Sequence, residues 1–226
     1  MKKKNNNRKL YILLIILLGS GFFILNEVNP ELLNRIYDRI EYSDFDEDKD
    51  YLEVTLDPCD TNTIPLPNTK ANISYNEKYP YYSYTDNKAR VIRVEAKQIY
   101  PKKRKGRLCD YIYPSNNNNK AKTASGYITD GNDDRGHLIA DRFDGVSNSY
   151  NITAQHEVAN KIEYQKVEND ISRHINRGDK VTNFTIDVKY ESIIDRRPLY
   201  YDIEFKVNHK TYKYRLHNEN RPIEKR

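Results

Sequence analysis

The chain has 226 residues, which is enough for one compact domain with an N-terminal appendage and too few for two full domains. Only 37% of the residues are hydrophobic, with 20 Tyr and no Trp, so aliphatic side chains and tyrosine rings must fill the core, which favours a strand-rich fold. The net charge of +5 would attract polyanions but excludes a surface that is strongly basic throughout.

Residues 1–25 have the pattern of an export signal. Lys and Arg at positions 2, 3, 4, 8 and 9 precede an apolar stretch from Leu10 to Leu25. This stretch is slightly shorter than the ~20 residues of a comfortable membrane span, and no clear small-x-small cleavage site follows it. We expect an uncleaved signal anchor, because the apolar stretch continues beyond the small residues 19–21. A cleaved signal peptide, with the protein secreted, is the alternative, and both put the rest of the chain outside the cytoplasm.

Residues 26–50 are charged and end in an acidic run, which predicts a stalk or linker before a domain at 51–226. The two cysteines, Cys59 and Cys109, would then lie in an oxidising compartment, where one disulfide is possible. Their spacing disfavours a metal site.

The pattern of expected strands on both sides of one long helix predicts an α+β fold with an antiparallel sheet. We expect a helix at 155–177, where apolar residues recur at helical spacing before Gly178. Alternation of apolar and polar residues, or strand-like composition, predicts the strands, at 51–56, 90–96, 184–190, 201–207 and 212–216. The composition of residues 65–87 and 115–125 predicts polar loops. A basic run at 102–107 is either a solvated loop or a contact for phosphate.

The stretch from Tyr127 to Asp170 contains the residues that indicate chemistry. A short strand at 127–129 and a turn at 130–132 are expected to present Asp133, Asp134, Arg135, Gly136 and His137. A lone His before Leu and Ile is usually structural. Here carboxylates, a guanidinium and a permissive Gly stand directly beside it, and a helix rich in amides and carboxylates follows, which indicates a functional site.

This stretch resembles the DNA/RNA non-specific endonucleases, which are ββα-metal nucleases and include membrane-anchored DNA-entry nucleases of Gram-positive bacteria. The resemblance rests on the tetrapeptide DRGH at 134–137, on Asn151, on Asn160 and on Glu168. It covers about residues 126–175 well and the terminal strands only loosely. It implies a ββα-metal nuclease fold, in which a long helix packs on an antiparallel sheet.

The resemblance also implies a role for each matching residue. His137 would be the general base, since a neutral imidazole with a pKa of ~6.5 can accept a proton from water. Asn160 would hold one Mg²⁺ or Mn²⁺ ion, a hard cation that keeps most of its waters. The remaining roles are a water-holding carboxylate at Glu168, an anchor for water or backbone at Asp134, a phosphate contact at Arg135 and a brace for the loop between strand and helix at Asn151. The substrate would be DNA, and also RNA, cut without sequence specificity to leave 5′-phosphates.

One position departs from the family pattern. Parts of the family carry an arginine one turn beyond the helix glutamate, but this chain has Ser172 there. Arg173 or Arg177 would substitute, and we assign the phosphate contact to Arg173. The alternative function is a catalytically inactive, surface-anchored protein that binds nucleic acid through the basic run and exposed tyrosines. An intact base and metal ligand argue against it. The sequence identifies no protein inhibitor, uptake machinery or biological role.

Overall fold

The structure is a computed structural model in which residues 45–60, 64–106, 131–192 and 194–226 are described. The leader, the stalk up to residue 44, the strand predicted at 127–129 and Cys109 lie outside these ranges. Cys59 is buried and disulfide-bonded. Among the described residues, the helices are too short or too polar for any of them to span a membrane.

Eight strands form one sheet in the order β1-β2-β3-β4-β7-β8-β9-β10. Their bounds are Leu52–Val54 (β1), Thr69–Asn72 (β2), Tyr81–Thr85 (β3), Val91–Ile99 (β4), Val181–Lys189 (β7), Tyr200–Val207 (β8), Lys210–His217 (β9) and Glu224–Lys225 (β10). All neighbours pair antiparallel except β1 and β2, which are parallel. The prediction of an α+β fold with a mostly antiparallel sheet is therefore confirmed.

The sheet has one apolar face and one charged face. Along β8, Tyr201, Ile203 and Phe205 are buried in the core, whereas the alternate residues Asp202 and Glu204 form ion pairs on the other side. This alternation is the period-two pattern of a sheet that is covered on one side only.

The prediction of a loop at 65–87 is wrong, because β2 and β3 lie within it. The buried residues there include the polar Thr69, Ser83 and Thr85. Their side chains form hydrogen bonds with one another and with Tyr150. These polar residues can therefore be buried, and the strands show no apolar pattern in the sequence.

The predicted helix is present but begins later than expected. Gln155 and His156 end strand β6 (Ile152–His156), and a π-helical segment, η5 (Ala159–Tyr164), leads into α3 (Gln165–Asn176). The wider π turn brings Ala159 and Tyr164 to the buried side and leaves Ile162 half exposed, although the helical pattern predicts Ile162 to be buried. The helix ends at Asn176, and Gly178, the predicted stop, follows with a positive φ of 86°.

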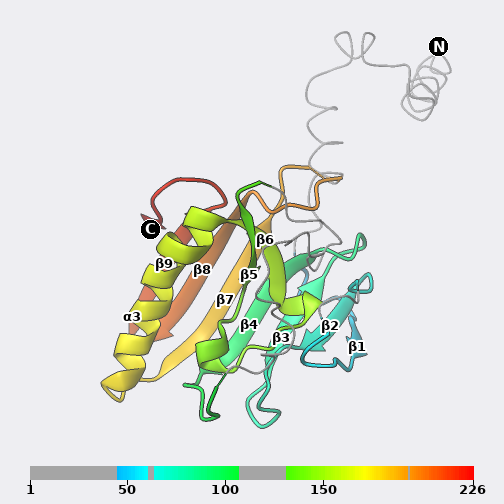
Figure 1. Ribbon diagram of the computed structural model, residues 1–226. Coiled ribbons are helices and arrows are strands. Elements are labelled where there is room, and N and C mark those ends of the chain that lie inside the picture. The colour runs from blue at the N-terminus through cyan, green and yellow to red at the C-terminus, as the bar shows by residue number, and fades with distance from the viewer. Residues whose placement is uncertain (1–44, 61–63, 107–130, 193) are drawn as a thin grey trace, which may run out of the picture. The chain divides into compact units, whose positions relative to one another are not determined.

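A second sheet consists of β5 (Asp133–His137) and β6. Figure 1 shows this pair and α3 in front of the larger sheet. Contacts agree with the picture, since Thr153 of β6 bonds to the hydroxyl of Tyr201 and Asp170 of α3 to that of Tyr214, both on the apolar side. The segment Asp133–His137 is thus itself a strand rather than the loop after a strand, because it pairs with β6 along its whole length.

Candidate active site

Close packing against the neighbouring strand β6 explains why the third residue of the DRGH tetrapeptide is glycine. In the β5–β6 register, Asp134 lies opposite Gln155 and Gly136 opposite Thr153. A Cβ at Gly136 would lie 2.2 Å from Cδ of Gln155, a side chain with no solvent exposure. Only glycine fits there without displacing a buried amide. Alternation along β5 sends Arg135 and His137 to the same side of the strand.

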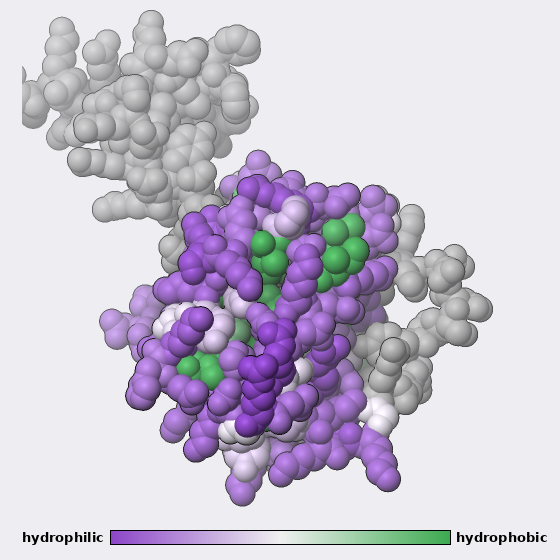
Figure 2. Space-filling model, turned by 90° about the vertical axis from the view of Figure 1, so that its left-hand side faces the viewer, coloured by the Kyte–Doolittle hydropathy of each residue, from purple (hydrophilic) through white to green (hydrophobic). Residues whose placement is uncertain are grey.

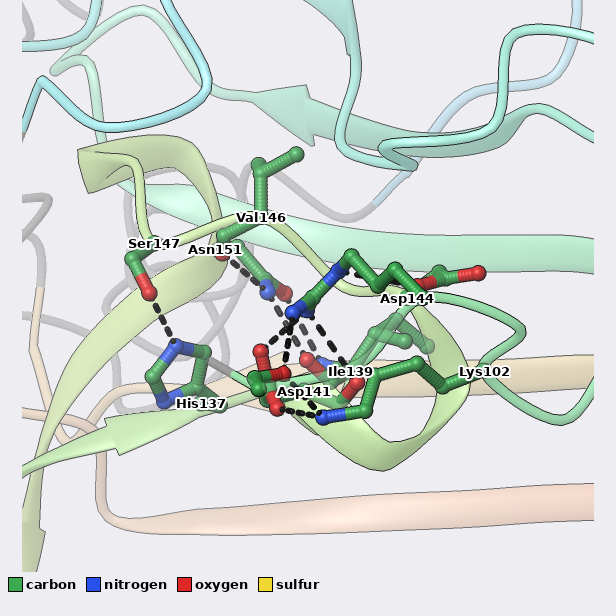
Figure 3. A network of polar contacts seen from close by, with 10 residues as sticks. Lys102, His137, Ile139, Asp141, Asp144, Val146, Ser147 and Asn151 are labelled. Atoms are coloured by element: carbon green, nitrogen blue, oxygen red, sulfur yellow. Dashed lines mark hydrogen bonds and ion pairs between the residues drawn. The ribbon is translucent and has the colours of Figure 1, made fainter. Parts of the chain in front are cut away.

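Asn151 fixes the loop that follows His137. Its side-chain oxygen accepts from the backbone N–H of Ile139 at 2.8 Å, and its amide nitrogen donates to the carbonyls of Ile139 and Val146, both at 2.8 Å. Figure 3 shows these bonds beside His137. The sequence predicts that Asn151 braces a loop between strand and helix, but this loop joins two strands, β5 and β6.

His137 contacts Ser147 in the same loop. Its Nε2 lies 3.1 Å from Oγ of Ser147, which is buried (Figure 3). If Nε2–H donates to this hydroxyl, the lone pair of the neutral imidazole is on Nδ1. Sequence reasoning did not identify Ser147, because a serine in a polar loop carries no signal until the loop folds back on β5.

Asp134 and Asn160 are brought into contact, although they come from different elements. The amide Nδ2 of Asn160 lies 3.3 Å from Oδ2 of Asp134. Nζ of Lys161 lies 3.0 Å from the same oxygen, and this hydrogen bond raises the pKa of Lys161. Two residues of η5 therefore converge on one carboxylate of β5.

The helix is also fastened to the end of β5. The hydroxyl of Tyr164 donates to the carbonyl of Leu138, the residue after His137. Burial raises the pKa of Tyr164 well above its usual range, and the nearby Glu168 adds to this effect. The hydroxyl thus stays protonated and keeps the donor that joins helix and strand.

Glu168 lies one turn beyond Tyr164 and is largely buried. Burial raises its pKa to about 6, and the charge of Arg142 only partly opposes this. Nε of Arg142 is 3.5 Å from Oε2 of Glu168. A carboxylate with an ordinary pKa of 4.5 is thus held where its charged form is poorly solvated, as is common at functional sites.

Other charged residues named from the sequence have structural partners. Arg197 binds Asp133 with two hydrogen bonds of 2.7 and 2.8 Å. Arg173 pairs with Asp170 at 2.7 Å, and Asp170 also accepts a hydrogen bond from the hydroxyl of Tyr214 of β9.

Two members of the basic run are likewise engaged within the protein. Lys102 and Arg104 both pair with Asp141, whereas Lys103 and Lys105 are exposed. Arg107 lies outside the described residues.

The described residues contain no group of three or more His, Cys, Asp or Glu side chains that could hold a metal ion. Asn160 beside Asp134 supplies hard oxygen donors, which fit Mg²⁺ or Mn²⁺ and do not fit a soft thiolate-binding ion.

A family model described as DNA/RNA non-specific endonuclease matches residues 67–209, which include β5, β6 and α3. The chain belongs to this family. The resemblance noted from DRGH, Asn151, Asn160 and Glu168 is confirmed, and the chain carries a nuclease domain.

Curated relatives are similar in sequence to a part of this chain. The type VII secretion system protein EssD of Staphylococcus aureus strain USA300 is 28% identical over 144 residues, which are 62% of this chain and 22% of that protein. The EssD protein of strain Newman matches to the same extent. The chain thus spans about a fifth of the length of these relatives.

Solved structures are similar at low identity. A crystal structure of NucA from Streptococcus agalactiae with magnesium bound has a TM-score of 0.48 and 16% identity, covering 69% of this chain and 84% of that chain. The metal-free NucA structure has a TM-score of 0.45 and 15% identity, covering 88% and 98%. The assignment to the family rests on the family match rather than on these scores.

Proposed function

We propose that the chain is a sugar-non-specific endonuclease that hydrolyses phosphodiester bonds of DNA, and also of RNA, outside the cytoplasm. It would use His137 as general base and one divalent cation, Mg²⁺ or Mn²⁺, held by Asn160. The observation that carries the proposal is the contact between Asn160 of the helix and Asp134 of the DRGH strand. It supports one site built from residues that are distant in sequence.

His137 would accept the proton of the attacking water. The contact with Ser147 holds the ring in one orientation, and if Nε2–H is the donor, Nδ1 carries the lone pair that would accept the proton. The neutral form predominates above its ordinary pKa of ~6.5, so the base would be competent at neutral pH.

A bound divalent cation would supply charge stabilisation at the phosphate and at the leaving oxygen. Asn160 would hold it through its amide oxygen, with Asp134 fixing the amide from its nitrogen side. Glu168 would orient a water of the site from its largely buried position, and Arg135, on the same side of β5 as His137, would contact phosphate.

A non-specific substrate fits the surface beside the helix. The face of the molecule on the side of α3 is mostly hydrophilic, with small and separate hydrophobic patches (Figure 2). Membership of a non-specific endonuclease family implies that phosphate contacts rather than base readout would dominate binding. An extracytoplasmic location is supported by the basic and apolar leader and by the name of the secretion-system relatives, and anchoring through residues 10–25 remains our proposal.

The test is loss of supercoiled plasmid on an agarose gel with Mg²⁺. We expect cleavage by the wild type, none after addition of EDTA, and almost none by His137→Ala, which should still bind DNA and keep its circular dichroism spectrum. Cleavage that survives EDTA or the His137→Ala substitution contradicts the mechanism. A gel shift without any cleavage by the wild type would support the catalytically inactive binding protein instead.

A further inference from the structure

The loop between β5 and β6 carries a cation that contacts Glu168. Arg142 lies in the short 3-10 helix η3 (Asp141–Phe143). Its Nε is 3.5 Å from Oε2 of Glu168, and its Nη1 donates to Oδ1 of Asn169 at 2.9 Å. The side chain of Arg142 is 43% exposed and that of Glu168 only 14%, so the guanidinium lies on the solvent side of the carboxylate.

Contacts on both sides of Arg142 fix the loop. Asp141 pairs with Lys102 at 2.7 Å and with Arg104, and the backbone N–H of Lys102 donates to the carbonyl of Arg142 at 2.9 Å. Phe143, on the other side, is buried in the core. Figure 3 shows Asp141 and Lys102 meeting beside the bonds of Asn151. A loop anchored in this way directs the Arg142 side chain towards α3.

The contacts of Arg142 do not resemble a structural ion pair. Nη1 donates a hydrogen bond to Asn169, whereas the contact of Nε with Glu168 is an ion pair that is long and partly exposed, so it adds little stability. A half-exposed guanidinium beside a carboxylate of the site is suited to bind a phosphate with two parallel hydrogen bonds.

Arg173, the arginine that the sequence suggested, is oriented differently. It pairs with Asp170, which is held by Tyr214 of β9. Among the described residues, Arg142 is the arginine that forms an ion pair with Glu168.

We propose that Arg142, rather than Arg173, binds a non-bridging oxygen of the substrate phosphate beside Glu168. This inference rests on the proposed function in that the substrate is a nucleic acid. The contact requires a planar fork of donors, so lysine should replace it only in part.

The experiment compares Arg142→Gln and Arg142→Lys with the rival Arg173→Gln in the full chain. Arg226→Gln is the matched control, because Arg226 is 49% exposed and lies 3.6 Å from Asp202 on the charged face of the sheet. Binding of a short fluorescein-labelled DNA duplex is measured by anisotropy in EDTA at several salt concentrations. Steady-state cleavage with Mg²⁺ then gives kcat and KM.

For Arg142→Gln we expect a Kd about tenfold higher in EDTA and a kcat/KM lower by about 10 to 100-fold, the loss typical of a charge-assisted hydrogen bond. The slope of log Kd against log salt should fall in magnitude by about 0.9, which reports one lost phosphate contact and which a purely structural role would not change. Arg142→Lys should recover most of the salt slope but little of kcat. Arg226→Gln should match the wild type.

The inference is overturned if Arg142→Gln keeps the wild-type slope and kcat/KM, or if Arg173→Gln loses more in both. Circular dichroism and the melting temperature establish that each variant folds. If the wild type fails to cleave, the proposed function fails, whereas the binding slopes in EDTA still test Arg142. If the wild type cleaves and Arg142→Gln does so equally well, only this inference fails.

Discussion

Glu168 is expected to destabilise the folded protein at neutral pH. Its carboxyl is largely buried, and burial raises its pKa from the ordinary 4.5 to about 6, with Arg142 as the one opposing charge. Between pH 4.5 and 6 the folded protein therefore holds a proton that the unfolded chain has already released, so stability falls as the pH rises through this window. One pKa unit is ~1.36 kcal/mol, so the loss at pH 7 is about 2 kcal/mol.

Glu168→Gln removes this penalty while keeping the shape of the side chain. We expect the variant to exceed the wild type in free energy of unfolding by about 2 kcal/mol more at pH 7 than at pH 4.5. Its kcat should fall about 10 to 100-fold, as is typical when a group that orients a metal-bound water is lost. Urea denaturation in EDTA at both pH values measures the first effect and steady-state cleavage the second.

The exposed Glu219→Gln is the control for the removal of one carboxylate from the surface. An equal stability change at both pH values would refute the reasoning, because it would mean that Glu168 is not held in a poorly solvated place. So would a variant that loses stability only at neutral pH, since that is the behaviour of a carboxylate stabilised by its charge partner.

Three further variants test the site, and a fourth measurement tests the leader. Gly136→Ala should cost about 1 to 3 kcal/mol of stability in urea denaturation, and adding Gln155→Ala should recover part of it; no recovery would mean that the two side chains do not compete for space. Ser147→Ala should lower kcat about tenfold without changing the Kd for DNA in EDTA, because only the orientation of the imidazole is lost; an unchanged kcat argues against this tautomer. Asn160→Ala should abolish cleavage, and calorimetry on the free wild type should detect only weak Mg²⁺ binding; normal cleavage by Asn160→Ala at low Mg²⁺ would assign the ion to carboxylates instead. Mass spectrometry of the exported protein should find the full-length N-terminus in the membrane fraction; a mature N-terminus between residues 19 and 30 would indicate a cleaved signal peptide.

Much of the fold could be predicted from local patterns. The alternation at 201–207 identified β8, because one face of the sheet is covered and the other carries ion pairs. Thr69 and Ser83 carried no such signal, since they are buried with hydrogen bonds to Tyr150, which comes much later in the chain. Strands β2 and β3 were therefore missed.

The sequence by itself determined the family, through the spacing of DRGH, Asn151, Asn160 and Glu168, and a long helix after the motif. This spacing can be recognised without the tertiary structure, because it is a property of the sequence itself. Only the tertiary structure decided that DRGH is a strand, that a π turn shifts the first helical residues, and that Ser147 lies against His137.

The contact between Arg142 and Glu168 was likewise decided only by the tertiary structure. Arg142 reaches this carboxylate because Lys102 and Arg104 hold the neighbouring Asp141. These ion pairs form only when the segment after β4, the loop after β5 and α3 come together in the folded domain. The family resemblance pointed to Arg173 instead, because Arg173 stands next to Ser172, the position one turn beyond Glu168. That comparison takes no account of a loop that packs against the helix.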